Sequence, residues 1–237
     1  MNLARQLFTA VADNDNPASV ASRLRERRFL DFARTLLRQS EPVKILDVGG
    51  TPQFWSRHAR ALGKAEVTLL NQDLTGLPIV EGLEYTVGDA RCMRQFHDRE
   101  FDMCFSNSVI EHFPTYAEQQ RFAAEIRRVA RGYYVQTPSR YFPIEPHFLV
   151  PGWQFAPLPV RAWMLQRRAW GWMPRAKSRA EALETARSIR LLTANELRRL
   201  FPEAEIRRES VAGLTKSLIA VKPAAPSEPE LTGEAIG

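Results

Sequence analysis

The chain has 237 residues, with 33 Lys and Arg against 27 Asp and Glu, which gives a formal net charge of +6. Its 44% hydrophobic and 25% charged residues and its two cysteines exclude a disulfide scaffold, a collagen-like fibre and a wholly disordered chain. One core can hold a chain of this length. No stretch reaches the roughly 20 apolar residues of a membrane-spanning helix, and no signal-peptide pattern opens the chain, so we expect a cytoplasmic protein.

The first part of the chain is predicted to form an arm and a helix. Residues 1–17 show no periodicity and are expected to fray. From Ser19 onward apolar residues recur at helical spacing, and Pro42 marks the end of this helix.

Strands and helices alternate over the next hundred residues. Short apolar or β-branched runs predict five strands, at 43–48, 66–70, 83–87, 101–106 and 133–137. Helical patterns follow the first strand, to about residue 62, and precede the fifth, over 115–130 after a break near Pro114. This alternation predicts βαβ units and a parallel sheet with helices on both faces.

Residues 138–190 interrupt the alternation with seven prolines and four tryptophans, and we predict an insertion, part helix and part lid. Thr193 and Glu196 then form a capping-box pattern for a helix ending near residue 201. Two late strands, at 205–211 and 217–221, are predicted to form a hairpin. Residues 223–237 have the composition of a disordered tail.

Glycines and polar residues gather where the predicted strands end. In doubly wound sheets, ligands bind outside the carboxyl ends of the strands, where the strand order reverses. Paired glycines let a backbone approach a ligand closely and present its N–H groups. The strand ends read Asp47-Val48-Gly49-Gly50, Asn71-Gln72-Asp73, Gly88-Asp89-Ala90 and Asn107-Ser108, with Glu111-His112 just beyond.

These residues resemble the class I S-adenosylmethionine-dependent methyltransferases, particularly the small single-domain members that include the ubiquinone-pathway enzymes. The resemblance rests on residues 45–50 (Ile-Leu-Asp-Val-Gly-Gly), 88–90 (Gly-Asp-Ala) and 101–112, in that order. It implies S-adenosylmethionine as the cofactor, with the methionine part lined by Asp47, Gly49 and Gly50, the ribose by Asn71, the adenine by Asp89 and Ala90, and the methyl region by Asn107. The family usually has an acidic residue where Asn71 stands, so Asp73 is an alternative ribose ligand.

The predicted fold is therefore an α/β, Rossmann-like, doubly wound, mostly parallel seven-stranded sheet. It has an antiparallel C-terminal hairpin, helices on both faces and a Pro/Trp-rich insertion after the fifth strand. We expect an N-terminal arm and helix at 1–42, a methyltransferase domain at 43–222 with its substrate lid at 138–190, and a tail at 223–237.

Methyl transfer from a sulfonium is an in-line displacement, so the protein chiefly positions the reactants and excludes water. A general base helps when the acceptor is a hydroxyl or a protonated amine. His112, just past the fourth strand, is the first candidate, with a helix-start histidine bonded to the backbone as the alternative. The other candidates are Glu111, His147, Glu145 and the phenol of Tyr141.

Residues 137–148 have the polar, aromatic and rigid character of an acceptor site, and a structural crossover is the alternative. Acceptor contacts are expected from Arg140, Tyr141, Glu145 and His147.

Some ubiquinone-pathway enzymes carry Glu-x-x-Glu-His after the fourth strand and bind a divalent metal there. Ser108 replaces the first of these carboxylates, so we predict that no metal is required.

The positive charge is concentrated late in the chain, because residues 161–208 hold 12 basic and 5 acidic residues. Within 158–173, arginines alternate with tryptophans, which fits a helix lying on a membrane surface or covering a greasy acceptor. The alternative is an amphipathic lid packed on its own domain. The expected partner is a small-molecule or lipid- or glycan-linked acceptor, and the most specific form of this hypothesis is an anionic acceptor. The helix within 158–173 is expected to make peripheral contact with the inner membrane face.

Two other functions share the fold. A nicotinamide-dependent oxidoreductase would need Gly-x-Gly-x-x-Gly after the first strand, which residues 49–52 (Gly-Gly-Thr-Pro) do not supply. A non-catalytic protein or nucleic-acid binder could stack bases between arginines and tryptophans. The proline-rich tetrapeptide of amino-methylating DNA enzymes is absent after the fourth strand, so nucleic acid is not the expected partner.

Overall fold

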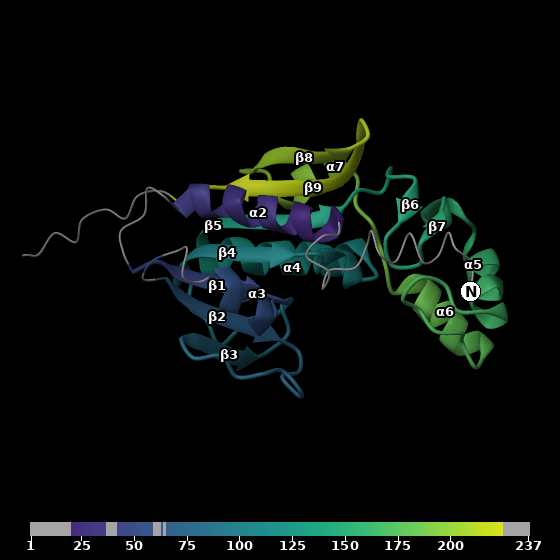
Figure 1. Cartoon of the computed structure of the whole chain (residues 1–237), viewed down its shortest axis with the longest axis horizontal. Helices are drawn as coiled ribbons and strands as arrows, with labels where there is room; N and C mark the ends of the chain where they lie inside the picture. Colours follow the sequence, from purple (N-terminus) through teal and green to yellow (C-terminus); the bar gives the residue numbers. More distant parts are fainter. Residues whose placement is uncertain (1–19, 37–41, 59–62, 64, 225–237) are drawn as a thin grey trace, which may run out of the picture.

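The computed structural model describes residues 20–36, 42–58, 63 and 65–224 (Figure 1). The predicted arm at 1–17 and nearly all of the predicted tail at 223–237 lie outside these residues. The main sheet contains β1 (Lys44–Val48), β2 (Glu66–Asn71), β3 (Leu83–Val87), β4 (Phe101–Asn107), β5 (Ala130–Pro138), β8 (Glu205–Val211) and β9 (Leu214–Lys222).

Seven strands form this sheet in the order β3-β2-β1-β4-β5-β9-β8. The strands from β1 to β5 pair in parallel, β9 runs antiparallel to β5, and β8 runs antiparallel to β9. This arrangement confirms the predicted mostly parallel sheet with an antiparallel C-terminal hairpin. The order reverses between β1 and β4, so their carboxyl ends flank the place where such sheets bind ligands.

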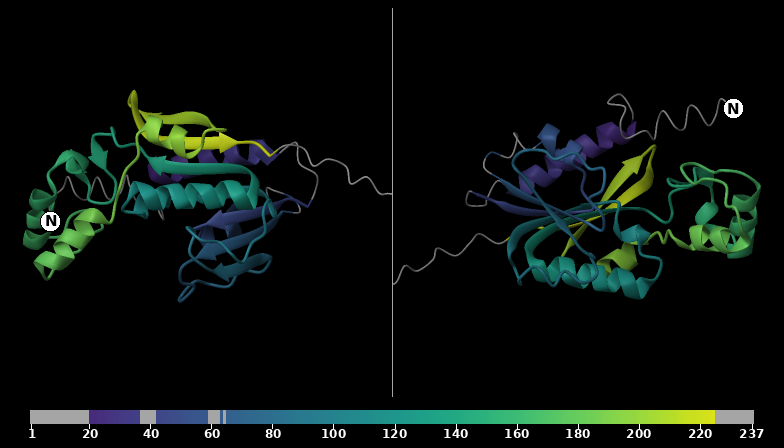
Figure 2. Two further views of the ribbon diagram at one scale, coloured as in Figure 1. Left: turned by 180° about the vertical axis from the view of Figure 1, so that it is seen from behind. Right: turned by 90° about the horizontal axis from the view of Figure 1, so that it is seen from below.

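Helices cover both faces of the sheet, as Figure 2 shows. One face carries α2 (Val20–Leu36) and α3 (Pro52–His58), and the other carries α4 (Tyr116–Val129) and α7 (Ala194–Leu200). Successive strand side chains point to opposite faces. Ile45 accordingly packs in one buried cluster with Phe32 of α2, whereas Leu46 packs in the other with Phe122 of α4.

The predicted capping box at Thr193 and the predicted hairpin are present, and two strands are longer than expected. Thr115 and Thr193 each form a capping box, with Glu118 and Glu196 respectively. The short η2 helix (Ile110–His112) precedes α4, at the predicted break. β9 begins at Leu214 rather than at 217 because a two-residue turn with positive φ joins it directly to β8. β5 begins at Ala130 because α4 runs straight into it.

The predicted insertion forms a separate layer at the carboxyl end of the parallel strands (Figure 1). It contains β6 (Ile144–Glu145), β7 (Val150–Pro151), η3 (Trp153–Phe155), α5 (Leu158–Arg167) and α6 (Arg179–Arg187). Phe148, Trp153 and Leu165 belong to its own buried cluster. Of the helices in the described part of the chain, none has the length and apolarity to cross a membrane.

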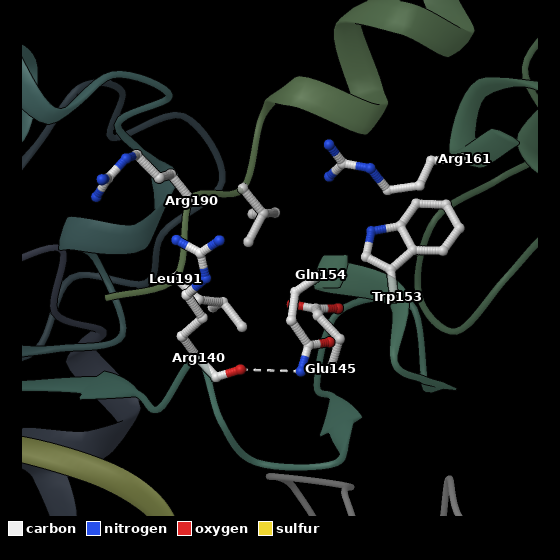
Figure 3. Close-up of a pocket in the computed structure, with 8 residues that line it drawn as sticks. Arg140, Glu145, Trp153, Gln154, Arg161, Arg190 and Leu191 are labelled. Atoms are coloured by element: carbon white, nitrogen blue, oxygen red, sulfur yellow. Dashed lines mark hydrogen bonds between the residues drawn. The ribbon is translucent and has the colours of Figure 1, made fainter. Parts of the chain in front are cut away.

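The insertion returns to the sheet beside the end of β5. The Arg140 N–H donates to the Leu192 carbonyl over 3.0 Å, and Ser139 forms a β-bridge with Leu192. A cavity of about 170 Å³ lies at this junction between insertion and sheet (Figure 3).

Candidate active site

The loop after β1 contains two glycines that leave no space for a side chain. Gly49 has φ +76°, and a Cβ atom there would lie 2.5 Å from Cγ2 of Val109. A Cβ atom on Gly50 would lie 1.8 Å from Oδ2 of Asp47. The Gly50 N–H has no partner among the described residues, so the loop presents an accessible donor to a ligand.

Asp47 lies beneath this loop. Its side chain accepts a hydrogen bond from Nε1 of Trp55 over 2.6 Å, and the residue is 2% exposed. Burial raises the pKa of Asp47 to about 7, although the Trp55 hydrogen bond opposes this shift. Trp55 therefore holds the Asp47 carboxyl in the space that a side chain at Gly50 would need.

The end of β2 is joined to the same loop through Asn71, whose Nδ2 donates to the Gly50 carbonyl over 3.0 Å. The Oδ1 atom of Asn71 has no partner among the described residues, so it can accept from a hydroxyl. Asp73, the alternative ribose ligand, accepts instead from the hydroxyl and the N–H of Thr75, and these bonds lower its pKa. Both of these bonds end on Oδ1 of Asp73, which leaves Oδ2 for a ligand, so Asn71 and Asp73 both stay candidates for the ribose.

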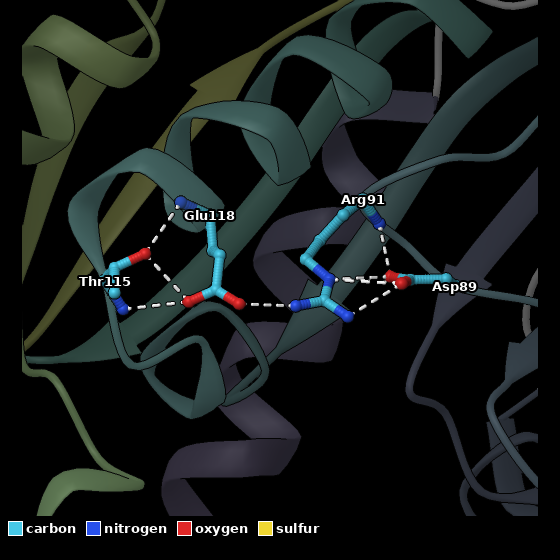
Figure 4. A network of polar contacts seen from close by, with 4 residues as sticks. All are labelled: Asp89, Arg91, Thr115 and Glu118. Carbon is cyan, nitrogen blue, oxygen red and sulfur yellow. Dashed lines mark hydrogen bonds and ion pairs between the residues drawn. The ribbon is translucent and has the colours of Figure 1, made fainter.

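Asp89, at the turn after β3, is held by an arginine that the sequence analysis did not single out (Figure 4). Arg91 contacts both carboxylate oxygens of Asp89, with Nη2 lying 2.8 Å from Oδ2, and its hydrogen bonds lower the pKa of Asp89. Nη1 of Arg91 also contacts Glu118, the capping residue of α4, over 2.5 Å. Ala90 beside them is buried. The Asp-x-Arg spacing was a signal that could have found this pair.

Asn107, at the end of β4, is held by Arg28 of α2. Nη1 of Arg28 donates to Oδ1 of Asn107 over 2.9 Å, while Nε and Nη2 contact the two carboxylate oxygens of Glu209 at 2.9 and 2.6 Å. Arg28 is 8% exposed. No local pattern could have predicted this contact, because 181 positions separate Arg28 from Glu209.

Four titratable residues meet between the end of β4 and the insertion. Nδ1 of His147 donates to Oε1 of Glu145 over 2.6 Å. The rings of His147 and His112 are nearly perpendicular, with centroids 5.0 Å apart. Glu111 accepts from the Thr137 hydroxyl through Oε2, and its buried Oε1 has no hydrogen-bond partner. The structure therefore brings three of the four predicted catalytic residues together.

The surroundings shift the pKa values of His112 and His147 in opposite directions. Burial, reinforced by the charge of His147, lowers the pKa of His112 to about 4. Burial would also lower the pKa of His147, but its hydrogen bond to Glu145 and the carboxylates of Glu145 and Glu111 outweigh this effect and raise it. Burial raises the pKa of Glu111 to about 7. His147 is thus the stronger base of the two histidines.

Tyr141, the fourth predicted catalytic residue, lies outside this cluster. It is 69% exposed, and its ring stacks on Phe155 with centroids 6.4 Å apart. Its assignment as a base stays a prediction, and the geometry gives it no support.

The same cluster has the geometry of a small metal site. Glu111, His112 and His147 each offer one ligand atom, and these atoms lie within 4.8 Å of one another. This set supplies a single carboxylate, whereas Mg²⁺ and Ca²⁺ prefer several oxygen ligands. The expectation that no metal is required stays a prediction.

Comparisons with known proteins agree with the observed fold. Residues 46–133 match a family model described as a methyltransferase domain, and no curated protein matches the chain. The chain is similar to the CurJ carbon methyltransferase, at 12% identity over 94% of this chain and 57% of that one, with a TM-score of 0.55. A protein from Pyrococcus horikoshii OT3 shows 16% identity over 95% of this chain and 100% of that one, with a TM-score of 0.50. A SAM-dependent methyltransferase from Methanosarcina mazei shows 19% identity over 77% of this chain and 92% of that one, with a TM-score of 0.49.

The sheet order and the helices on both faces define a Rossmann-like α/β fold, which the similar methyltransferase structures share. Residues 46–133 match the methyltransferase domain, in agreement with the resemblance drawn from the strand ends. S-adenosylmethionine is the cofactor that this domain implies.

Proposed function

We propose that the protein is an S-adenosylmethionine-dependent methyltransferase that moves a methyl group to a hydroxyl of a small-molecule or lipid- or glycan-linked acceptor. One observation carries the proposal. The glycine loop after β1 and the His147–Glu145 pair lie at the same edge of the sheet, at the carboxyl ends of its parallel strands.

The residues at this edge fit the cofactor. A Cβ atom on either glycine of the loop would meet the protein itself, at Val109 or Asp47, so packing requires glycine at both positions. The Gly50 N–H, which has no partner among the described residues, is left as a donor for a carboxylate of the cofactor. Asn71 keeps an acceptor oxygen for a ribose hydroxyl, and Asp89 carries its carboxylate in a position fixed by Arg91. When bound, S-adenosylmethionine supplies the activated methyl group, so these residues need only bind and orient.

His147 is the proposed general base. Glu145 accepts the Nδ1 proton of His147, which leaves Nε2 as the nitrogen that takes the acceptor proton. His147, whose pKa is raised by Glu145 and Glu111, suits a hydroxyl acceptor better than His112, whose pKa is about 4. His112 and Glu111 then form the wall against which the His147 ring rests.

A direct test is to incubate the purified protein with methyl-labelled S-adenosylmethionine and a metabolite extract from a strain that lacks the gene. Transfer of label to an extract component, with loss of transfer in His147→Ala and not in His97→Ala, is expected, because His97 is exposed and lies outside the site. If no component takes label, or if His147→Ala transfers as well as the unaltered protein, the proposal fails.

Peripheral membrane contact is a second proposal, supported by the outer face of the insertion. α5 buries Ala162 and Leu165, whereas Trp163 and Trp172 are each 52% exposed. The Arg167 guanidinium stacks over Trp163, 4.2 Å from the ring centroid. Exposed tryptophans with arginines suit an anionic interface.

Flotation with anionic vesicles tests this contact. The unaltered protein is expected to float with the vesicles, and Trp163→Ala/Trp172→Ala to remain in the soluble fraction. If the unaltered protein does not float, the contact and the proposed location at the inner membrane face are wrong.

A further inference from the structure

The cavity between the insertion and the sheet contains two arginine side chains whose donors are not used up. The Arg140 guanidinium has no hydrogen bond or ion pair with a described residue. Arg161 donates from Nη1 to the Ala186 carbonyl over 3.0 Å, but its buried Nε has no partner. In Figure 3 the guanidinium groups of Arg140 and Arg161 face the space between the two side chains. Nε of Arg161 is the donor that burial leaves without a partner, and such a donor is costly, so an acceptor is missing beside it. Arg140 is half-buried, and its guanidinium faces the same space.

The other charged groups around the cavity are already paired. Arg190 contacts Gln119 over 2.7 Å and Glu196 over 2.5 Å, so its guanidinium is committed elsewhere. Glu145 accepts from Nδ1 of His147 and from the N–H groups of His147 and Phe148. Two cationic groups therefore remain beside one satisfied carboxylate, which favours a ligand with a single negative charge.

Gln154, which also lines the cavity, lacks a hydrogen-bond donor rather than an acceptor. Nε2 of Gln154 donates to the carbonyls of Arg140 and Phe142 at 3.0 and 2.8 Å, which fixes the orientation of its amide. Its Oε1 is buried and has no partner. A ligand hydroxyl would satisfy this oxygen.

The walls and the volume suit a ring. Trp153, Ile189 and Leu191 supply apolar surface, and Trp153 is itself fixed by stacking on Phe148 with centroids 4.0 Å apart. The cavity volume is about 170 Å³, and a cavity of about 150 Å³ is known to hold benzene. One six-membered ring with its substituents therefore fills the space.

We propose that this cavity binds a six-membered ring that carries both a carboxylate and a hydroxyl, with the carboxylate on Arg140 and Arg161 and the hydroxyl on Gln154. The inference rests on the proposed function, because it makes this ring the anchoring part of the methyl acceptor. Glu145 lines the cavity and also accepts from Nδ1 of His147, so a ring seated here adjoins the carboxylate that orients the proposed base. Phosphate fits less well, since its second charge would face the Glu145 carboxylate.

Ligand-observed NMR or calorimetry in the presence of S-adenosylhomocysteine tests the inference. The acidic probes are D-glucuronate and 3,4-dihydroxybenzoate, their neutral counterparts are D-glucose and catechol, and inorganic phosphate is the third anion. We expect the binding of at least one acidic probe to exceed that of its neutral counterpart and of phosphate by about tenfold or more, as expected for one charge-assisted contact.

Three variants locate that binding. Arg140→Gln and Arg161→Gln are each expected to weaken the acidic probe about tenfold or more, while S-adenosylhomocysteine binds as before. Arg199→Gln is the matched control, because Arg199 is exposed on α7. If Arg161→Gln does not fold, Gln154→Glu replaces it, and the added charge is expected to abolish binding of the acidic probe.

The outcomes separate the two proposals. Failure of S-adenosylhomocysteine to bind overturns the proposed function. If it binds but no acidic probe does, or if neutral probes or phosphate bind as well, the inference about the cavity is wrong while the proposed function stands. Equal losses in Arg140→Gln and Arg199→Gln would also contradict it, because they would show a general charge effect.

Discussion

Nδ1 of His147 donates to Oε1 of Glu145 over 2.6 Å, and the His147 ring stands nearly perpendicular to that of His112. Glu145 belongs to β6 of the insertion, whereas His112 ends the short helix after β4. The insertion therefore does more than cover the sheet. It supplies the histidine that the proposed reaction uses and the carboxylate that orients it.

This contact predicts how His147 titrates. Since Glu145 raises the pKa of His147, Glu145→Gln is expected to lower it. The neutral, basic form of His147 then persists to lower pH, while in the unaltered protein it is populated only as the pH rises through the raised pKa. NMR titration of the histidine rings measures the pKa of His147 in the unaltered protein and in Glu145→Gln. His97→Asn identifies the signal of an exposed histidine, which serves as the reference. An unchanged titration in Glu145→Gln would contradict the pairing.

The glycine loop predicts a strong coupling between two positions. In Gly50→Ala the new Cβ atom must displace the Asp47 carboxylate from Trp55, which we expect to cost about 1.5–3 kcal/mol, the usual value of a hydrogen bond to a charged group. In an Asp47→Ala background, the same change should cost at least about 1 kcal/mol less. Urea unfolding of the four proteins measures the cycle, and additive effects would show that the two positions are independent.

Arg28 predicts a contribution of the N-terminal helix to the site. In Arg28→Met, Glu209 loses its buried partner and Asn107 loses its donor, so unfolding should become easier by about 3–5 kcal/mol. Arg28→Met/Glu209→Met should recover much of this loss. Arg27→Met is the control, because Arg27 is exposed on the same helix. Equal effects of Arg27→Met and Arg28→Met on urea unfolding would refute the role of this contact.

The triad of Glu111, His112 and His147 predicts no dependence on Mg²⁺ or Ca²⁺, because it offers one carboxylate only. Two imidazoles and one carboxylate can hold Zn²⁺, so Zn²⁺ is the ion that tests the expectation that no metal is required. Thermal unfolding is expected to be the same before and after treatment with EDTA, and the same again after addition of Mg²⁺ or Zn²⁺. A fall in Tm with EDTA that Zn²⁺ reverses would show a resident ion.

The sequence predicted the sheet well because the strand signals are local. Short apolar runs closed by glycine or Asp mark the strands, and the fold rules then leave few arrangements. The predicted cofactor residues rest on the same local signals, since Asp47, Asn71, Asp89 and Asn107 all lie at or directly after strand ends.

The contacts that hold those residues could not be predicted in the same way. Arg28 and Glu209 meet only because α2 and β8 pack near the end of β4. The position of His112 along the chain makes it the first candidate for the base. Burial and the nearby charge of His147 lower its pKa, and neither can be read from the sequence. The cavity formed by Arg140, Gln154 and Arg161 likewise depends on how the insertion folds back on β5.

Calorimetry with S-adenosylhomocysteine, S-adenosylmethionine and NAD tests the central claim most directly. We predict that both sulfur compounds bind with dissociation constants in the micromolar range, that Gly50→Ala weakens both, and that NAD does not bind. If neither sulfur compound binds at high micromolar concentration, or if NAD binds in their place, the chain is not the methyltransferase described here.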